Sequence, residues 1–235
     1  MNKTTSTKRP ADQRGHTDIS WLDSWHTFSF GDYDEPEHHS FHSLRVINED
    51  RVAPSRGFPN HPHRDMEILT YVVSGELTHR DSMGHARTVH AGQVQAMGAG
   101  SGVTHSESND SATEPVHFLQ IWIMPQARGL KPTYAEWSPS PQQTGPLALV
   151  ASPDGRDSSI VIRQDAQVYV GELKEGEVLT HTTRADRGLW VQVISGELVI
   201  DRERLQAGDG LGLEGASAYE ISAPATARFL LFDLA

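Results

Sequence analysis

The chain contains no cysteine, no long apolar run and no cluster of basic residues. Without cysteine there are no disulfides, no redox thiols and no thiolate metal ligands. No apolar stretch approaches the roughly 20 residues of a membrane-spanning helix, and residues 1–14 lack the apolar core of a signal peptide. A net charge of −11 argues against direct binding to nucleic-acid phosphates. We therefore expect a cytoplasmic protein without a membrane or direct nucleic-acid partner.

The chain also lacks a long amphipathic helical pattern. Its 20 glycines and 13 prolines instead punctuate short runs rich in β-branched and aromatic residues. Examples of these runs are residues 68–73, 117–123 and 188–194. Short strands between regular turn residues are typical of a β-sandwich or β-barrel, so the sequence predicts an all-β fold.

An internal repeat divides the chain. The segment YVVSGEL at residues 71–77 returns as VQVISGEL at residues 191–198, and Ala91-Gly92 returns as Ala207-Gly208. A pattern that occurs twice predicts two copies of one β-barrel. We expect four parts: a flexible N-terminus (1–12), an N-terminal barrel (13–130), a proline-rich linker (131–146) and a C-terminal barrel (147–235).

Two short clusters contain the residues best suited to bind a metal. His61-Pro62-His63 and His105-Ser106-Glu107 each place two candidate ligands at i and i+2, which on a β-strand share one face. Two histidines with one or two further ligands and open positions form a mononuclear site that suits Fe(II) and neighbouring metals. The two clusters therefore predict a metal centre.

The second copy of the repeat lacks these ligands. Aligned on the conserved turns, the four positions are occupied by Thr182, Arg184, Ile221 and Ala223. His181 lies nearby but has no second ligand beside it in the sequence. We therefore expect one metal, in the N-terminal barrel.

Three segments resemble the signatures of a known family. Residues 57–64 (GFPNHPHR), 98–107 (GAGSGVTHSE) and 21–31 (WLDSWHTFSFG) are similar to those of the pirin family of bicupins, especially its compact bacterial members. The resemblance implies two antiparallel, jelly-roll-like β-barrels packed face to face, with one mononuclear metal in the N-terminal barrel. It assigns His61, His63, His105 and Glu107 as metal ligands.

The same resemblance implies an activity. Some pirins open quercetin with O₂, so we expect a metal-dependent dioxygenase for a flavonol, acting as a monomer and releasing carbon monoxide and a depside. Iron(II) is the expected metal; zinc, nickel, manganese, copper and cobalt suit the same ligands. The alternative is a metal-binding, redox-sensing regulatory protein that has a protein partner and no turnover, because some eukaryotic members act as nuclear transcription cofactors.

Two carboxylates are candidates for the catalytic base. Glu107 is the candidate favoured by the family pattern, both as ligand and as base. Glu67 is the rival, because it lies four residues after His63 and strand parity places it on the same face as His61 and His63. We expect Glu67 to be a pocket group and not a ligand. The remaining histidines, among them His79, have no paired spacing and are interpreted as core or surface residues.

Overall fold

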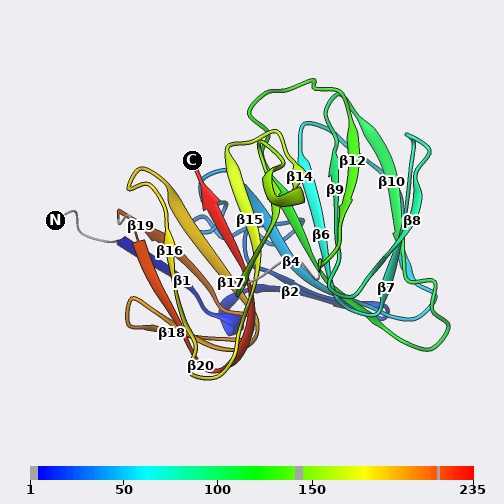
Figure 1. Cartoon of the computed structure of the whole chain (residues 1–235). Coiled ribbons are helices and arrows are strands. Elements are labelled where there is room, and N and C mark those ends of the chain that lie inside the picture. The colour runs from blue at the N-terminus through cyan, green and yellow to red at the C-terminus, as the bar shows by residue number, and fades with distance from the viewer. Residues whose placement is uncertain (1–4, 141–144, 216–217) are drawn as a thin grey trace. The chain divides into compact units, whose positions relative to one another are not determined.

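The computed structural model describes residues 5–140, 145–215 and 218–235. Almost all of its regular structure is β-strand; the helical segments are two single turns, Ala11–Gln13 and Arg156–Ser158 (Figure 1). The prediction of an all-β fold is therefore confirmed. Within these described ranges, no helix is long and apolar enough to cross a membrane.

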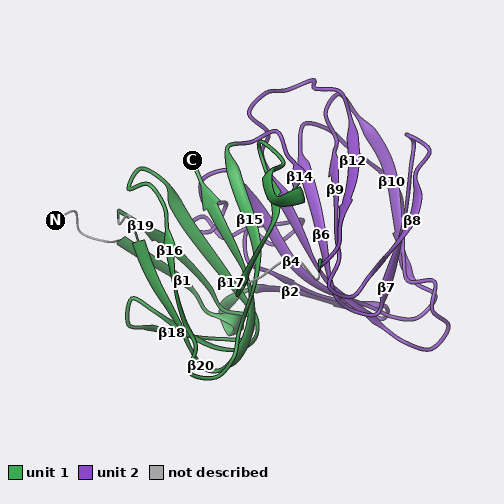
Figure 2. Ribbon diagram, in the orientation of Figure 1, with its two compact units in different colours: residues 1–14, 140–159, 165–235 green, residues 15–139, 160–164 purple. Residues whose placement is uncertain are grey.

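The chain forms two compact units (Figure 2). Unit 1 comprises residues 1–14, 140–159 and 165–235, and unit 2 comprises residues 15–139 and 160–164. These limits differ from the expected ones at both ends of the N-terminal barrel. Strand β1 (Thr5–Arg9), within the segment expected to be flexible, pairs with β19 of unit 1. Strand β12 (Thr133–Trp137), within the expected linker, pairs with β9 of unit 2; residues 141–144 of that linker lie outside the described part.

Unit 2 contains two antiparallel sheets. The larger has the strand order β12-β9-β6-β11-β4-β3-β2, and the smaller has the order β5-β10-β7-β8. The bounds in the larger sheet are β2 Gly15–Ile19, β3 Leu22–His26, β4 Leu44–Val52, β6 Glu67–Ser74, β9 Val94–Gly98 and β11 Val116–Ile123. Those in the smaller sheet are β5 Gly57–His63, β7 Glu76–Asp81, β8 Ala86–His90 and β10 Val103–Ser108.

Side chains of the two sheets meet in the interior of unit 2. Strand alternation places an apolar cluster there, which includes Val72, Leu77 and Phe118. Beside it, Thr70 of β6 and Gln120 of β11 hydrogen-bond to Glu107 of β10. A second apolar cluster, which includes Ile68 and Val103, lies on the other side of these polar groups. The predicted site is therefore a polar region between two apolar parts of the core.

Unit 1 is built around one sheet with the order β1-β19-β17-β20-β15-β13; β16 also pairs with β20, and β18 with β17. Its core contains a large apolar cluster that includes Leu189, Val193, Ile221 and Phe229. The strand bounds are β13 Leu147–Ser152, β15 Ala166–Leu173, β16 Val178–Thr182, β17 Gly188–Ile200, β18 Glu203–Gln206, β19 Gly210–Glu214 and β20 Ala218–Leu234. Strand β14 (Ile160–Val161) belongs to unit 2.

The repeat is visible in the backbone of both units. Gly75 and Gly196, the glycines of the two Ser-Gly-Glu-Leu segments, have φ angles of 77° and 78°. A Cβ at either position would lie within 3 Å of a carbonyl oxygen of the adjacent strand, that of Pro115 or of Thr226. Both copies therefore need glycine for the same left-handed turn and the same close approach.

The expectation of closed barrels is not confirmed. Among the described residues of unit 2, β12 and β2 are the edges of the larger sheet and β5 and β8 those of the smaller. In the described part of unit 2, no backbone ladder joins the two sheets, and side chains hold them together. Turn punctuation and strand length are alike in sandwiches and barrels, so the sequence pattern could not distinguish them.

Candidate metal centre

Strand pairing brings three of the predicted ligands together. His61 on β5 lies directly opposite His105 on β10, and His63 lies opposite Val103 two positions along. One ring nitrogen from each of the three histidines lies within 4.8 Å of the others. The i, i+2 spacing therefore places the rings on one face of the sheet, as predicted.

The hydrogen-bond partners assign which nitrogen His61 and His105 present to the centre. His61 Nδ1 donates to the carbonyl oxygen of Pro59 (2.8 Å), which leaves Nε2 with a lone pair. His79 Nε2 donates to the Asp81 carboxylate (3.0 Å), so His79 Nδ1 accepts from His105 Nδ1 (3.4 Å). His105 Nε2 is then also unprotonated.

These two lone pairs face each other. His105 Nε2 and His61 Nε2 are 3.1 Å apart. Two ligand nitrogens at right angles around one metal, each bonded at about 2.1 Å, would be about 3.0 Å apart. The donor set thus fits a divalent transition metal between the two rings, and without a cation the two lone pairs would repel.

The protein keeps two of these imidazoles neutral. Burial, followed by repulsion from the neighbouring rings, lowers the pKa of His105 to about 3. Burial and the proximity of His61 lower the pKa of His63 to about 4. Both rings are therefore unprotonated near neutral pH, as metal ligands must be.

Glu107 lies beside this cluster at the bottom of the site. It is 1% exposed and accepts hydrogen bonds from Thr70 Oγ1 (3.2 Å), Gln95 Nε2 (3.0 Å) and Gln120 Nε2 (2.7 Å). Burial raises the pKa of its carboxyl to about 7, although these hydrogen bonds oppose the shift. A bound cation would favour the ionised form of the carboxyl. Glu107 is therefore suited to be an anionic metal ligand that loses its proton when a metal binds.

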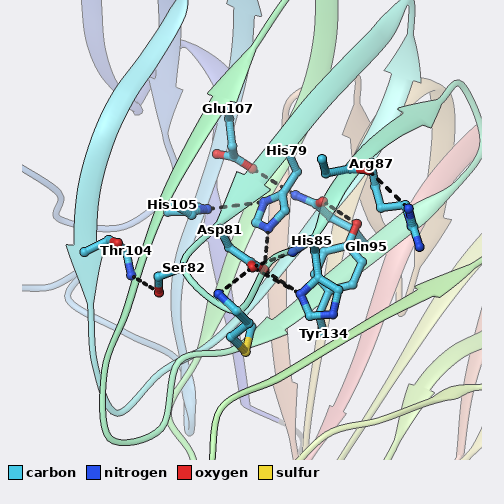
Figure 3. Close-up of polar contacts among 12 residues, drawn as sticks. His79, Asp81, Ser82, His85, Arg87, Gln95, Thr104, His105, Glu107 and Tyr134 are labelled. Atoms are coloured by element: carbon cyan, nitrogen blue, oxygen red, sulfur yellow. Dashed lines mark hydrogen bonds and ion pairs between the residues drawn. The ribbon is translucent and has the colours of Figure 1, made fainter.

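A second group of ligand atoms within 4.8 Å of one another joins Glu107 and His105 to His79 (Figure 3). His79 is fully buried on β7, opposite Glu107 in the β10–β7 pairing. Its interpretation as an ordinary core or surface histidine is incomplete, because it supports His105. The signal that was available is the alternation His79-Arg80-Asp81, which puts His79 and its carboxylate partner on one face of a strand.

Asp81 anchors this support. Its carboxylate accepts from His79, from the His85 ring (2.9 Å) and from the backbone N–H groups of Met83 and His85 (2.9 and 3.1 Å). Figure 3 shows His79 between His105 and Asp81, with the ring of Tyr134 stacked on both His79 and His85. The orientation of His105 therefore depends on residues of β7, of the turn that follows it and of β12, since Tyr134 lies on β12.

Glu67 does not lie at this site. Its carboxylate points to the side of β6 opposite Thr70, where it lies beside Gly98 and interacts with Arg163. The parity argument was wrong because the strand does not continue: β5 ends at His63, Asp65 has a φ of 50°, and β6 begins in the other sheet. The turn reverses the side that Glu67 faces.

The first signature requires a glycine at its start. A Cβ on Gly57 would lie 2.2 Å from the carbonyl oxygen of Glu107. The β5–β10 register also shifts between His105 and Glu107, so the extra residue is accommodated as a bulge. Gly57 therefore permits the close strand approach that positions His61 opposite His105.

A cavity of about 510 Å³ opens beside the centre, entirely within unit 2. His61, His63 and Glu107 contribute to one part of its wall. Other lining residues come from β2, β3, β4 and β11: His16, Thr17, Leu22, Ser24, His26, Asn48, Asp50, Gln120 and Trp122. The size and the mixed lining match those of small-molecule sites.

An all-β chain with a repeated unit and one histidine-rich centre beside a cavity has the features of a bicupin metalloprotein. The family models agree: Pirin matches residues 7–123, and the quercetinase C-terminal cupin domain matches residues 149–234. The chain belongs to the pirin family, and its fold is the pirin bicupin fold.

Named relatives cover nearly the whole chain. A quercetin 2,3-dioxygenase of Escherichia coli K12 is 45% identical over 96% of this chain and 97% of its own length. A putative quercetin 2,3-dioxygenase of Pasteurella multocida is 42% identical over 96% and 98%. The crystal structure of the E. coli pirin YhhW with nickel(II) superposes with a TM-score of 0.93 at 43% identity, covering 98% of this chain and 99% of that one. The chain is thus similar to enzymes of the quercetin 2,3-dioxygenase type.

Proposed function

We propose that this chain is a metal-dependent dioxygenase that opens a flavonol ring with O₂, with His61, His63, His105 and Glu107 as the metal ligands. The observation that carries the proposal is the 3.1 Å approach of two ring nitrogens, His61 Nε2 and His105 Nε2, beside a cavity large enough for a flavonol. The names of the relatives support the substrate class.

The ligand set would leave two positions for exogenous ligands on a six-coordinate metal. When bound, the metal would supply a Lewis acid that lowers the pKa of a coordinated hydroxyl and a redox-capable or templating centre for O₂. Iron(II) is our proposal for the physiological metal, although nickel is present in the structure of the E. coli relative.

The residues around the centre have separate roles in this scheme. Glu107 takes the proton of the flavonol 3-hydroxyl, because its carboxylate lies beside His105 and also lines the cavity in which the flavonol would bind. Thr70, Gln95 and Gln120 hold its carboxylate in place. Glu67 has no role in the proton transfer, because it faces away from the cavity.

The test combines metal analysis with turnover. The purified protein would be reconstituted with each candidate metal, and loss of the flavonol absorbance band would be followed under air and under nitrogen, with and without a chelator. We expect about one metal per chain, consumption that needs both metal and O₂, and carbon monoxide among the products. Metal-loaded protein that consumes no flavonol with any metal would refute the dioxygenase and favour the regulatory alternative.

Two variants make the test specific. His105→Ala should lose both metal and turnover, because it removes a ring that faces the centre. His181→Ala is the matched control, because His181 is a buried histidine of unit 1 bonded to Asp233 (3.0 Å) and not to the site. Loss of metal in the control variant would show that the centre has been assigned to the wrong unit.

A further inference from the structure

Asp50 is a buried carboxyl in the wall of the cavity. It lies on β4, is 4% exposed and lines the same cavity as Glu107. Ser24, its partner across the β3–β4 pairing, hydrogen-bonds to it. Its Oδ1 atom has no hydrogen-bond partner among the described residues. A buried carboxyl oxygen without a hydrogen-bond donor destabilises the fold, so we expect a bound ligand to donate a hydrogen bond to it.

The surroundings of Asp50 give it no structural counter-ion. Among the described residues, the charged groups that interact with it are Glu49, Asp23 and, further into the cavity, Glu107, and all three are acidic like Asp50 itself. Burial, which is the largest effect, raises the pKa of Asp50 to about 7. A carboxyl placed only for stability would be expected to pair with a cation or with several donors, and Asp50 has one hydroxyl.

A second polar atom in the same cavity wall also lacks a hydrogen-bond partner among the described residues. Trp122 Nε1 on β11 is buried without an acceptor in the part of the chain that the structure describes. Trp122 lines the cavity and packs against His63, with ring centroids 5.0 Å apart. Asp50 pairs with Phe118 and Trp122 with Val46, so their backbone positions are four residues apart along the strands, roughly 13 Å. A cavity wall of that length can accommodate a rigid molecule of three rings.

We propose that Asp50 is a specificity-determining residue that binds a phenolic hydroxyl of the substrate remote from the oxygens that reach the metal. This proposal rests on the proposed function and adds to it a preference for polyhydroxylated flavonols over those without peripheral hydroxyls. Ser24 orients the carboxyl, and Oδ1 accepts from the phenol. Trp122 Nε1 is left to donate to an oxygen near the metal end.

The experiment measures binding without turnover. Nickel-loaded protein under nitrogen would be titrated with quercetin and with 3-hydroxyflavone, which keeps the 3-hydroxyl and 4-carbonyl but has no other hydroxyl. The variants are Asp50→Leu and Asp50→Asn. The matched control is Glu49→Gln, which removes a carboxyl from the adjacent position of β4, where it bonds to Arg51 and His117. Metal content would be measured for every variant.

Asp50→Leu should weaken quercetin binding at least about tenfold and leave 3-hydroxyflavone within about twofold, because a hydrogen bond to a carboxylate is lost for one ligand only. Asp50→Asn should weaken quercetin binding about threefold or more and leave the binding of 3-hydroxyflavone unchanged. This variant provides the test if the leucine variant does not fold. Glu49→Gln should change neither. If Asp50→Leu weakened the binding of both flavonols equally, or of neither, the proposed role of Asp50 would be overturned and the proposed function would stand. If neither flavonol bound metal-loaded wild type, both this proposal and the proposed function would be overturned.

Discussion

Asp81→Asn should weaken metal binding although Asp81 is not a ligand. The side-chain oxygen of the asparagine will stay on the two backbone N–H groups of Met83 and His85, because both can only donate. Its NH₂ group must then face His79 Nε2, which has to become an acceptor. His79 will then carry its proton on Nδ1. His105 Nδ1 will have to accept a hydrogen bond from that N–H group.

The consequence is the wrong tautomer at the centre. His105 would carry its proton on Nε2, the atom that is 3.1 Å from His61 Nε2. Binding a metal would require that proton to move to Nδ1, against the hydrogen bond from His79. Loss of such supporting partners typically lowers metal affinity about 10- to 100-fold, equivalent to about 1.4–2.8 kcal/mol.

The assay is competition for nickel(II) or cobalt(II) against a chromophoric chelator, with the ligand-field spectrum as an independent readout of the coordination sphere. Asp110→Asn is the matched control, because Asp110 is an exposed carboxylate of the same unit that pairs with Arg80 (3.3 Å). A folded Asp81→Asn protein with wild-type affinity and spectrum would refute the claim that Asp81 sets the tautomer of His105.

Three further predictions concern the same centre. Metal affinity should fall at least about tenfold per pH unit below pH 7, because the Glu107 carboxyl has a pKa of about 7 and must lose its proton to bind, whereas burial keeps the pKa of His63 (about 4) and of His105 (about 3) below this range; chelator competition from pH 5 to 8 measures this, and a flat profile would mean that Glu107 does not bind the metal. Glu107→Gln should cost at least about tenfold in metal affinity while Glu67→Gln spares it, since only Glu107 faces the rings; a crystal structure with Glu67 coordinated would reverse the assignment. Gly57→Ala should lower the melting temperature and loosen the metal, because the new methyl group would lie 2.2 Å from the Glu107 carbonyl oxygen; thermal unfolding with and without nickel checks it, and an unchanged melting temperature with unchanged stabilisation by nickel would refute it.

The sequence alone determined the fold class, the repeat and the three histidines that lie together at the candidate centre. Turn residues at regular intervals and matched glycines, Gly75 and Gly196, report local backbone needs that any reader of the chain can recognise. The pairs His61/His63 and His105/Glu107 were likewise visible, because strand alternation is a property of two neighbouring residues and needs no knowledge of the partner strand.

The tertiary structure decided what depends on which strands meet. Glu67 faces the side opposite to the one that strand parity predicts, because the turn after His63 leads the chain into another sheet. The role of His79 became apparent only when the pairing of β7 with β10 placed it against His105. The cavity and the incomplete Asp50 carboxyl arise where β3, β4 and β11 lie side by side, although their residues are far apart in the chain. Long-range contacts of this kind leave no periodic signal in the sequence, so only the folded chain reveals them.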